Sequence, residues 1–182
     1  MQIEFSIQEI EKCQEFANSI DTGYYANRKQ FNNEKRIKDQ IIGKIAEICA
    51  YKYLTIKNID VSFPDFAIYK RTGKNWNCDL KSQDYEFHIK SQSIEQGKRY
   101  GVSWIFENSD KTVFKNISDN GYVCFVSIDL NNRVGEIRAV VNLQDLHKHQ
   151  LFQKPQLSYL TTKSAVYFDQ LEKTLGNNLL AI

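Results

Sequence analysis

The sequence lacks the features that mark membrane, secreted and zinc-finger proteins. No apolar run approaches the roughly 20 residues that a membrane-spanning helix needs, and the N-terminus has no signal-peptide pattern. We therefore expect a cytoplasmic protein with no membrane partner. Its cysteines are far apart rather than in close pairs, which favours reduced core thiols over a zinc site or a disulfide framework. These cysteines are Cys13, Cys49, Cys78 and Cys124.

Repeats, linkers, low-complexity tracts and a strong charge of either sign are also missing from the sequence. The 182 residues fit one domain, 1–182, and apolar and charged residues make up 42% and 25%, as in ordinary soluble proteins. The net charge of +2 indicates no partner by itself. Basic residues nevertheless gather in three stretches that could hold a polyanion. They are Arg28 to Lys44, Lys70 to Lys74, and Lys98-Arg99.

Hydrophobic periodicity predicts helices near both ends and strands between them. We expect an α/β (α+β) fold in which helices flank a central mixed β-sheet. Gly43 in the second helix indicates close packing, because an interior glycine costs about 1 kcal/mol. The helices are predicted at 7–20, after the capping box Ser6-Ile7-Gln8-Glu9, at 33–54, and at 164–175, ended by Gly176; the strands are predicted at 60–69, 102–106, 122–128 and 136–141. The remainder of 93–119 is expected to be a surface excursion, and His147 and His149 are expected to be solvated.

The stretch 76–92 has the most regular pattern in the chain. Apolar and polar residues alternate in both halves, and Ser82-Gln83-Asp84 is suitable turn chemistry between them. We therefore expect a β-hairpin with one apolar and one polar face. The apolar face comprises Trp76, Cys78, Leu80, Tyr85, Phe87 and Ile89. The polar face comprises Asn77, Asp79, Lys81, Glu86, His88, Lys90 and Gln92.

The polar face of this hairpin has the groups that phosphodiester hydrolysis requires. That reaction needs a divalent ion held by carboxylates, an activated water, and a cation that offsets charge in the transition state. Mg²⁺ keeps several waters, so one or two protein carboxylates suffice. Asp79 and Lys90 would lie close together if the turn is centred near Asp84, and His88 shares the face of Lys90.

The order of these parts resembles the PD-(D/E)xK nuclease superfamily, which has the restriction-endonuclease-like fold. The matching parts are Glu47 within Gly43-Lys44-Ile45-Ala46-Glu47, Asp79 on one strand, and His88-Ile89-Lys90 on the next. The resemblance covers about residues 33–141 at the level of architecture. It implies that Asp79 binds the metal and that Lys90 orients the attacking water or stabilises the developing charge. It also implies that Glu47 supports the metal directly or through water.

Two departures from the family pattern leave alternatives open. The family usually has Asp or Glu where this chain has His88, so that ligand is missing, is replaced by the imidazole, or is supplied by Glu86. A second register, in which Pro64-Asp65 is followed by Asp79-Leu80-Lys81, also fits the family formula. We favour the register of Asp79 and Lys90, because the strand that carries Lys90 has the better apolar face. Asp79 belongs to both.

The resemblance implies a Mg²⁺-dependent DNA endonuclease of restriction type, in which Mn²⁺ can replace Mg²⁺. We expect double-stranded DNA as the substrate and a homodimer where the target is palindromic. The basic stretches predict strongly salt-dependent DNA binding. Two other hypotheses stand beside this one: a DNA-binding module that kept the fold and lost cleavage, and a repair or recombination nuclease of the same superfamily.

Overall fold

The computed structural model describes residues 1–20, 32–68 and 78–180, and all statements below concern these residues. The strands are β1 (Gln2–Glu4), β2 (Leu80–Lys81), β3 (Glu86–Ser93), β4 (Ser103–Glu107), β5 (Gly121–Asp129), β6 (Val134–Asn142) and β7 (Lys163–Tyr167). The helices are α1 (Ile7–Ser19), α3 (Asn33–Ile56), α4 (Ile94–Tyr100), α5 (Lys111–Phe114), α6 (Leu143–Lys148) and α7 (Phe168–Leu175), followed by the 3₁₀ helix η1 (Gly176–Leu180). No helix among them is long and apolar enough to span a bilayer.

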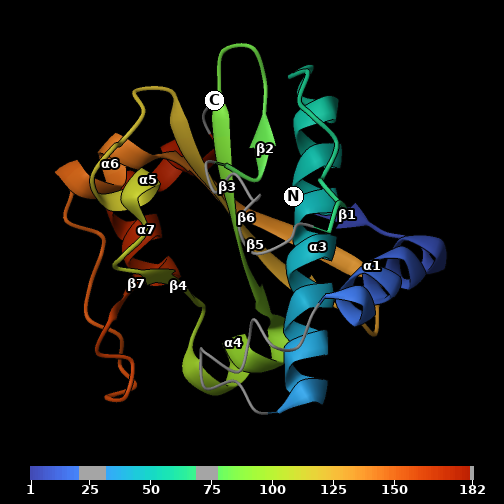
Figure 1. Cartoon of the computed structure of the whole chain (residues 1–182). Coiled ribbons are helices and arrows are strands. Elements are labelled where there is room, and N and C mark those ends of the chain that lie inside the picture. Colours follow the sequence, from blue (N-terminus) through green and yellow to red (C-terminus); the bar gives the residue numbers. More distant parts are fainter. Residues whose placement is uncertain (21–31, 69–77, 181–182) are drawn as a thin grey trace.

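The strands form one mixed five-stranded sheet and one separate pair. The sheet has the order β1-β6-β5-β3-β2, and β4 pairs with β7. β3 and β5 are parallel and the other neighbours are antiparallel. α3 lies along one side of the sheet, whereas α5, α6, α7 and the β4–β7 pair lie on the other (Figure 1). The predicted mixed α/β fold with a helix-flanked sheet is therefore confirmed.

The two N-terminal helices begin where the sequence predicts. The Ser6 hydroxyl accepts a hydrogen bond from the Glu9 N–H at 3.2 Å, and the Glu9 carboxylate accepts one from the Ser6 N–H at 2.7 Å. This capping box satisfies two N–H groups that the first turn of α1 leaves unpaired. The Asn32 side chain caps α3 by accepting from the Lys35 N–H at 2.9 Å.

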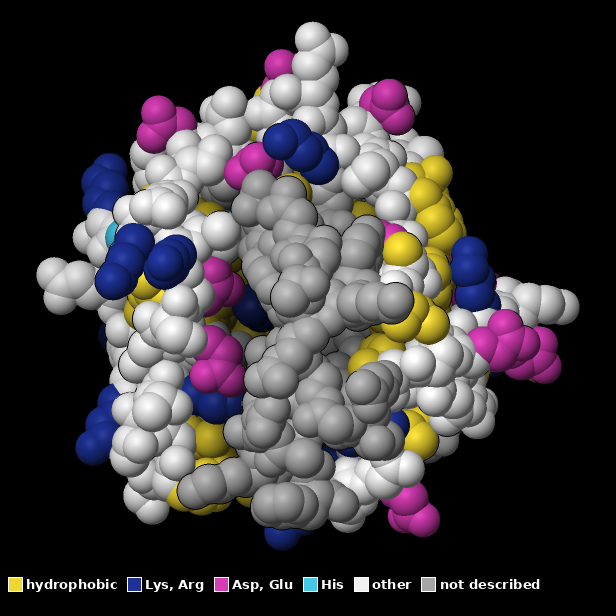
Figure 2. Space-filling view, viewed as in Figure 1, with side chains coloured by type: hydrophobic (Ala, Val, Ile, Leu, Met, Phe, Trp, Pro, Cys, Tyr) yellow, Lys and Arg dark blue, Asp and Glu magenta, His cyan; other side chains and the backbone are white. Residues whose placement is uncertain are grey.

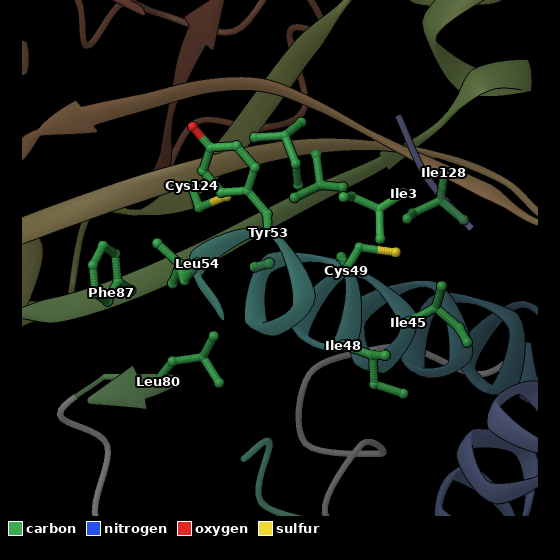
Figure 3. Close-up of a cluster of buried hydrophobic side chains, with 14 of the residues drawn as sticks. Ile3, Ile45, Ile48, Cys49, Tyr53, Leu54, Leu80, Phe87, Cys124 and Ile128 are labelled. Atoms are coloured by element: carbon green, nitrogen blue, oxygen red, sulfur yellow. The ribbon is translucent and has the colours of Figure 1, made fainter. Parts of the chain in front are cut away.

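α3 buries one apolar face against the sheet and forms the first core (Figure 3). Cys49 lies in this core with Ile45 and Tyr53, and all three side chains are fully buried. Burial raises the pKa of the Cys49 thiol to about 12, so it stays protonated and unreactive near neutral pH. All four cysteines are free; Cys78 is half-buried and the other three are buried.

The expectation that Gly43 marks close packing is wrong for the described residues, because a methyl group there would meet none of their atoms within 4 Å beyond the adjoining backbone of α3. We predict that Gly43→Ala raises the free energy of unfolding by about 0.5–1 kcal/mol, since alanine removes the entropic cost of glycine in α3. Gly135→Ala is the contrasting variant, because its methyl group would collide with Cys49. Urea denaturation of both variants checks this, and a loss of stability in Gly43→Ala would contradict it.

The predicted hairpin forms with a shorter first strand. β2 pairs antiparallel with β3, with Leu80 opposite Phe87 and Lys81 opposite Glu86. Ser82 fixes the turn, because its N–H donates to the Tyr85 carbonyl at 2.9 Å and its hydroxyl accepts from the Tyr85 N–H at 2.8 Å. The register places Asp79 opposite His88 rather than opposite Lys90. Trp76 and Asn77 of the predicted strand lie outside the described residues.

The predicted strand at 60–69 is wrong, since residues 60–68 form no strand and residue 69 lies outside the described part of the chain. Two hydrogen bonds join this segment to β2: the Ser62 N–H donates to the Lys81 carbonyl at 2.7 Å, and the Ser62 hydroxyl accepts from the Lys81 N–H at 3.0 Å. Pro64 has no N–H to donate, and the Asp65 carboxylate accepts from the N–H two residues later at 2.8 Å. This local turn competes with strand pairing.

Two predictions in the second half of the chain need correction. The remainder of 93–119 is not a surface excursion, because it forms α4 and α5 and buries Ser93 and Val113. The predicted helix at 164–175 starts only at Phe168, because the preceding residues form β7 and pair with β4. The strands predicted at 102–106, 122–128 and 136–141 are confirmed as β4, β5 and β6.

A second core fills the face of the sheet opposite α3. The Phe125 ring of β5 lies 4.7 Å from the Trp104 ring and 6.2 Å from the Phe106 ring, measured between centroids. The Trp104 indole N–H also donates to the Val126 carbonyl at 3.2 Å, beside a register shift between β5 and β6. β4 is thereby fixed against the centre of the sheet.

The prediction that His147 is solvated is wrong. Its Nε2 lies 2.7 Å from the Val113 carbonyl, and its ring packs 4.7 Å from that of Phe152. His147 therefore joins α6 to the second core. His149 is exposed, as predicted.

Candidate functional site

His88 and Lys90 project from β3 toward the second core. Their partners on the parallel strand β5 are Val123 and Phe125, and both of these belong to that core. Side chains on paired residues share a face of the sheet, so His88 and Lys90 face away from α3. Glu86 has the same parity on β3 and lies on the same face.

Asp79 is attached to β3 between these two residues. Its N–H donates to the Phe87 carbonyl at 2.9 Å, and its carboxylate Oδ2 accepts from the Ile89 N–H at 2.7 Å. The carboxylate occupies the position that a strand carbonyl would take in a continued ladder. Asp79 thus lies just before the start of β2, as an acid beside His88 and Lys90.

The Lys90 ammonium lies over an aromatic ring. Nζ is 4.8 Å from the centroid of the Phe106 ring, and the side chain is half-buried. Among the residues that the structure describes, Lys90 takes part in no ion pair. A half-buried cation that has no ion pair within the described chain favours the approach of an external anion.

His88 is only 7% exposed, and burial lowers the pKa of its imidazole. The nearby Asp79 carboxylate acts in the opposite direction, Lys90 lowers the pKa further, and Asp110 and Glu86 raise it. The net lowering leaves the imidazole neutral near pH 7, so it can accept a proton or a hydrogen bond.

Asp110 is a residue that the sequence interpretation missed. It caps α5, where Oδ1 accepts from the Thr112 N–H at 3.1 Å and from the Thr112 hydroxyl at 2.6 Å. Its capping pattern was visible in the sequence. Its proximity to His88 was not, because it depends on how residues 93–119 fold.

We predict that His88 makes the protein less stable in mild acid. The unfolded chain binds a proton at His88 with a pKa of about 6.5, and the folded chain binds it less readily. Stability therefore falls as the pH drops below about 6.5 toward the lower folded pKa. The urea midpoints measured at pH 7.5 and at pH 5.5 should differ less in His88→Gln than in the parent. His149→Gln, at an exposed histidine, should behave as the parent; an unchanged pH dependence in His88→Gln would contradict the prediction.

Glu47 lies elsewhere in the fold. It projects from α3, and its carboxylate pairs with the Lys44 ammonium at 2.6 Å, with both side chains 13% exposed. The same ammonium donates to the Asp65 carbonyl at 2.8 Å. α3 covers the other face of the sheet, so the structure does not bring Glu47 to the face of His88 and Lys90.

The residues of the second register are attached to different elements of the fold. Asp65 is attached to α3 through Lys44, whereas Asp79 is attached to β3. Lys81 is exposed and pairs with Glu86 at 3.1 Å. The favoured register, in contrast, has Asp79, His88 and Lys90 on neighbouring positions of one hairpin.

The basic stretches differ in whether their side chains already pair with acids. Lys98 and Arg99 form no ion pair within the described ranges. Arg28, Lys29 and residues 70–74 lie outside those ranges. In the first stretch Arg36 is buried and the lysines pair with acids, namely Lys35 with Asp39, Lys38 with Glu95, and Lys44 with Glu47. Figure 2 shows acidic and basic side chains close together near the middle of one face.

The side chains around His88 can provide only part of a magnesium shell. No group of three or more His, Cys, Asp or Glu side chains gathers as a metal site in the described part of the chain. Asp79 keeps Oδ1 and Asp110 keeps Oδ2 outside the hydrogen bonds described above. Because Mg²⁺ retains several waters, these oxygens fit an ion held by one or two carboxylates.

Comparisons with known proteins gave no match. Neither a protein-family model, nor a curated protein, nor a solved structure is significantly similar to this chain.

Proposed function

We propose that this chain is a Mg²⁺-dependent endonuclease that hydrolyses phosphodiester bonds in double-stranded DNA, and that Mn²⁺ can replace Mg²⁺. One observation carries the proposal: the Asp79 carboxylate is fixed at the Ile89 N–H, between a neutral His88 and a half-buried Lys90 that has no acid partner among the described residues. An acid, a base and an unpaired cation on neighbouring strand positions suit hydrolysis of an anionic ester.

Each of the three side chains has a role that follows from its surroundings. Lys90 would neutralise charge on the scissile phosphate, because no described acid competes for its ammonium. Asp79 would hold the metal through Oδ1, with Asp110 as a second carboxylate. The neutral His88 imidazole can accept the proton of the attacking water. When bound, the metal would act as a Lewis acid and lower the pKa of a coordinated water.

The setting of this activity is part of the proposal. A cytoplasmic restriction enzyme that cuts both strands of a palindromic target would act as a two-fold homodimer, which presents one site to each strand. Lys98 and Arg99 would contact phosphates, because they have no acid partner in the described ranges. DNA affinity should then fall steeply with salt.

Nicking of supercoiled plasmid tests the proposed function. The parent should nick the plasmid with Mg²⁺ or Mn²⁺ and stop when EDTA is added. Asp79→Asn is the sharpest variant, because an amide oxygen can still accept from the Ile89 N–H while the charge is lost. We expect its nicking rate to fall by about 100-fold or more, with the thermal midpoint unchanged. Nicking at the parent rate by Asp79→Asn would overturn the assignment.

The second candidate function is a DNA-binding module without cleavage. It is favoured by His88 in place of an acid and by the lack of a three-residue metal group in the described chain. Plasmid that is bound but not nicked at millimolar Mg²⁺ or Mn²⁺ would support it. Comparison of linear, nicked and branched DNA distinguishes the third hypothesis, a repair or recombination nuclease.

A further inference from the structure

A groove of about 550 Å³ opens beside the C-terminal part of β3. It lies between α4, the β4–β7 pair and the segment 155–160, all within the described chain. We infer that this groove binds unpaired DNA nucleotides that adjoin the scissile phosphate. The side chains that carry this inference are Gln92, Gln96, Arg99, Tyr100, Tyr159 and Tyr167.

The groove lies further along β3 than Lys90. Ser91 and Gln92, the next two residues of β3, both line it. A strand rises about 3.3 Å per residue, so Gln92 lies about 7 Å along the strand from Lys90. A nucleic-acid strand advances about 3.4 Å per nucleotide along a duplex. If the DNA strand runs along β3, a phosphate at Lys90 would therefore bring a nucleotide about two positions away to the groove.

Aromatic rings line the groove where nucleobases could stack. The Tyr159 side chain is 75% exposed and that of Tyr100 is 41% exposed, although both are large and mostly apolar. Tyr167 holds the segment 155–160 against β7, because its hydroxyl accepts from the Gln156 N–H at 2.9 Å. Bases stack on such rings with little regard to sequence.

The charges around the groove suit a phosphate backbone. The Arg99 guanidinium lies 5.0 Å from the Tyr100 ring and pairs with no acid in the described ranges. Glu95, the acid that lines the groove, is neutralised by Lys38 at 3.1 Å. Arg99 is thus left as a cation that can contact a phosphate, beside rings that can stack a base.

Unpaired nucleotides fit this lining better than a continuous duplex does. Base faces are hidden by stacking inside a duplex, so a tyrosine ring reaches them only where the strand is open. The groove would then favour DNA with a single-stranded segment beside the cleaved bond, such as a branched or frayed end. The placement of the scissile phosphate rests on the proposed function, whereas nucleotide binding by the groove does not.

Fluorescence anisotropy in EDTA tests the groove apart from cleavage. The probes are a labelled single-stranded oligonucleotide and the same strand annealed to its complement. Tyr159→Ala should weaken single-strand binding by roughly five- to 100-fold and leave duplex binding unchanged. Tyr159→Phe is the matched control and should bind as the parent, because it keeps the ring. Arg99→Ala should make the slope of log affinity against log salt concentration shallower for the single strand, by the amount that corresponds to about one lost phosphate contact.

The outcomes separate this inference from the proposed function. Single-strand binding that is unaffected by Tyr159→Ala and Arg99→Ala overturns the groove assignment, even if plasmid is nicked. Loss of single-strand binding in both variants, together with a parent that nicks no plasmid, supports the groove and rejects the nuclease. Equal losses for single strand and duplex in Tyr159→Ala also overturn the inference, because the groove would then bind DNA without regard to pairing.

Discussion

Lys90→Ala is expected to slow metal-dependent DNA cleavage by about 100-fold or more while the protein stays folded. The Lys90 ammonium lies 4.8 Å from the Phe106 ring centroid and pairs with no acid in the described chain, so its removal breaks no ion pair there. The loss should therefore fall on the charged transition state rather than on stability. Nicking rates at saturating plasmid, together with thermal midpoints, measure both effects.

Lys81→Ala is the matched control for Lys90→Ala. It removes the same charge from the same hairpin, but Lys81 is exposed and already paired with Glu86. We expect its nicking rate to stay within a few-fold of the parent, since exposed ion pairs contribute little. Equal effects of the two variants would show that only the net charge of the hairpin matters, and this would contradict a catalytic role for Lys90.

The second large effect is expected from Phe125→Ala, which should lower the free energy of unfolding by about 3–5 kcal/mol. The Phe125 side chain is fully buried in β5 and its ring contacts those of Trp104 and Phe106. Its removal leaves a cavity under β4 that rigid strands fill poorly. Such a loss is a large part of the 5–15 kcal/mol by which proteins of this kind are commonly stable. Equilibrium denaturation in urea measures it.

Ile105→Ala controls for the general effect of truncating an apolar strand residue. Ile105 lies between Trp104 and Phe106 on β4, but it points to the other side and is partly exposed. We expect a loss of about 1 kcal/mol or less. A comparable loss in both variants would mean that the second core does not depend on the Phe125 ring.

Local signals in the sequence were sufficient for much of the hairpin and for the N-terminal helices. The period of two placed Glu86, His88 and Lys90 on one face, and Ser6 with Glu9 fixed the start of α1. These features depend on residues within a few positions of one another, so they can be inferred without the fold.

Features that depend on distant pairing could not be inferred. β7 was predicted as helix because its partner β4 lies about 60 residues earlier in the chain, and pairing with that strand outweighs local preference. The proximity of Asp110 to His88 also depends on packing between distant parts of the chain. The position of Glu47 also needed the structure, because helical spacing alone does not show which face of the sheet α3 covers.

The support of Lys90 has a consequence for the timing of activity during synthesis. Lys90 rests on Phe106 of β4, and the hydrogen-bonded partner of β4 is β7, at residues 163–167. An unpaired strand or a lone hairpin is marginally stable in water. In a ribosome-bound chain that has not yet exposed β7, β4 would be unpaired. Phe106 would then give Lys90 no stable support. The proposed DNA cleavage would therefore begin only when β7 has left the ribosome.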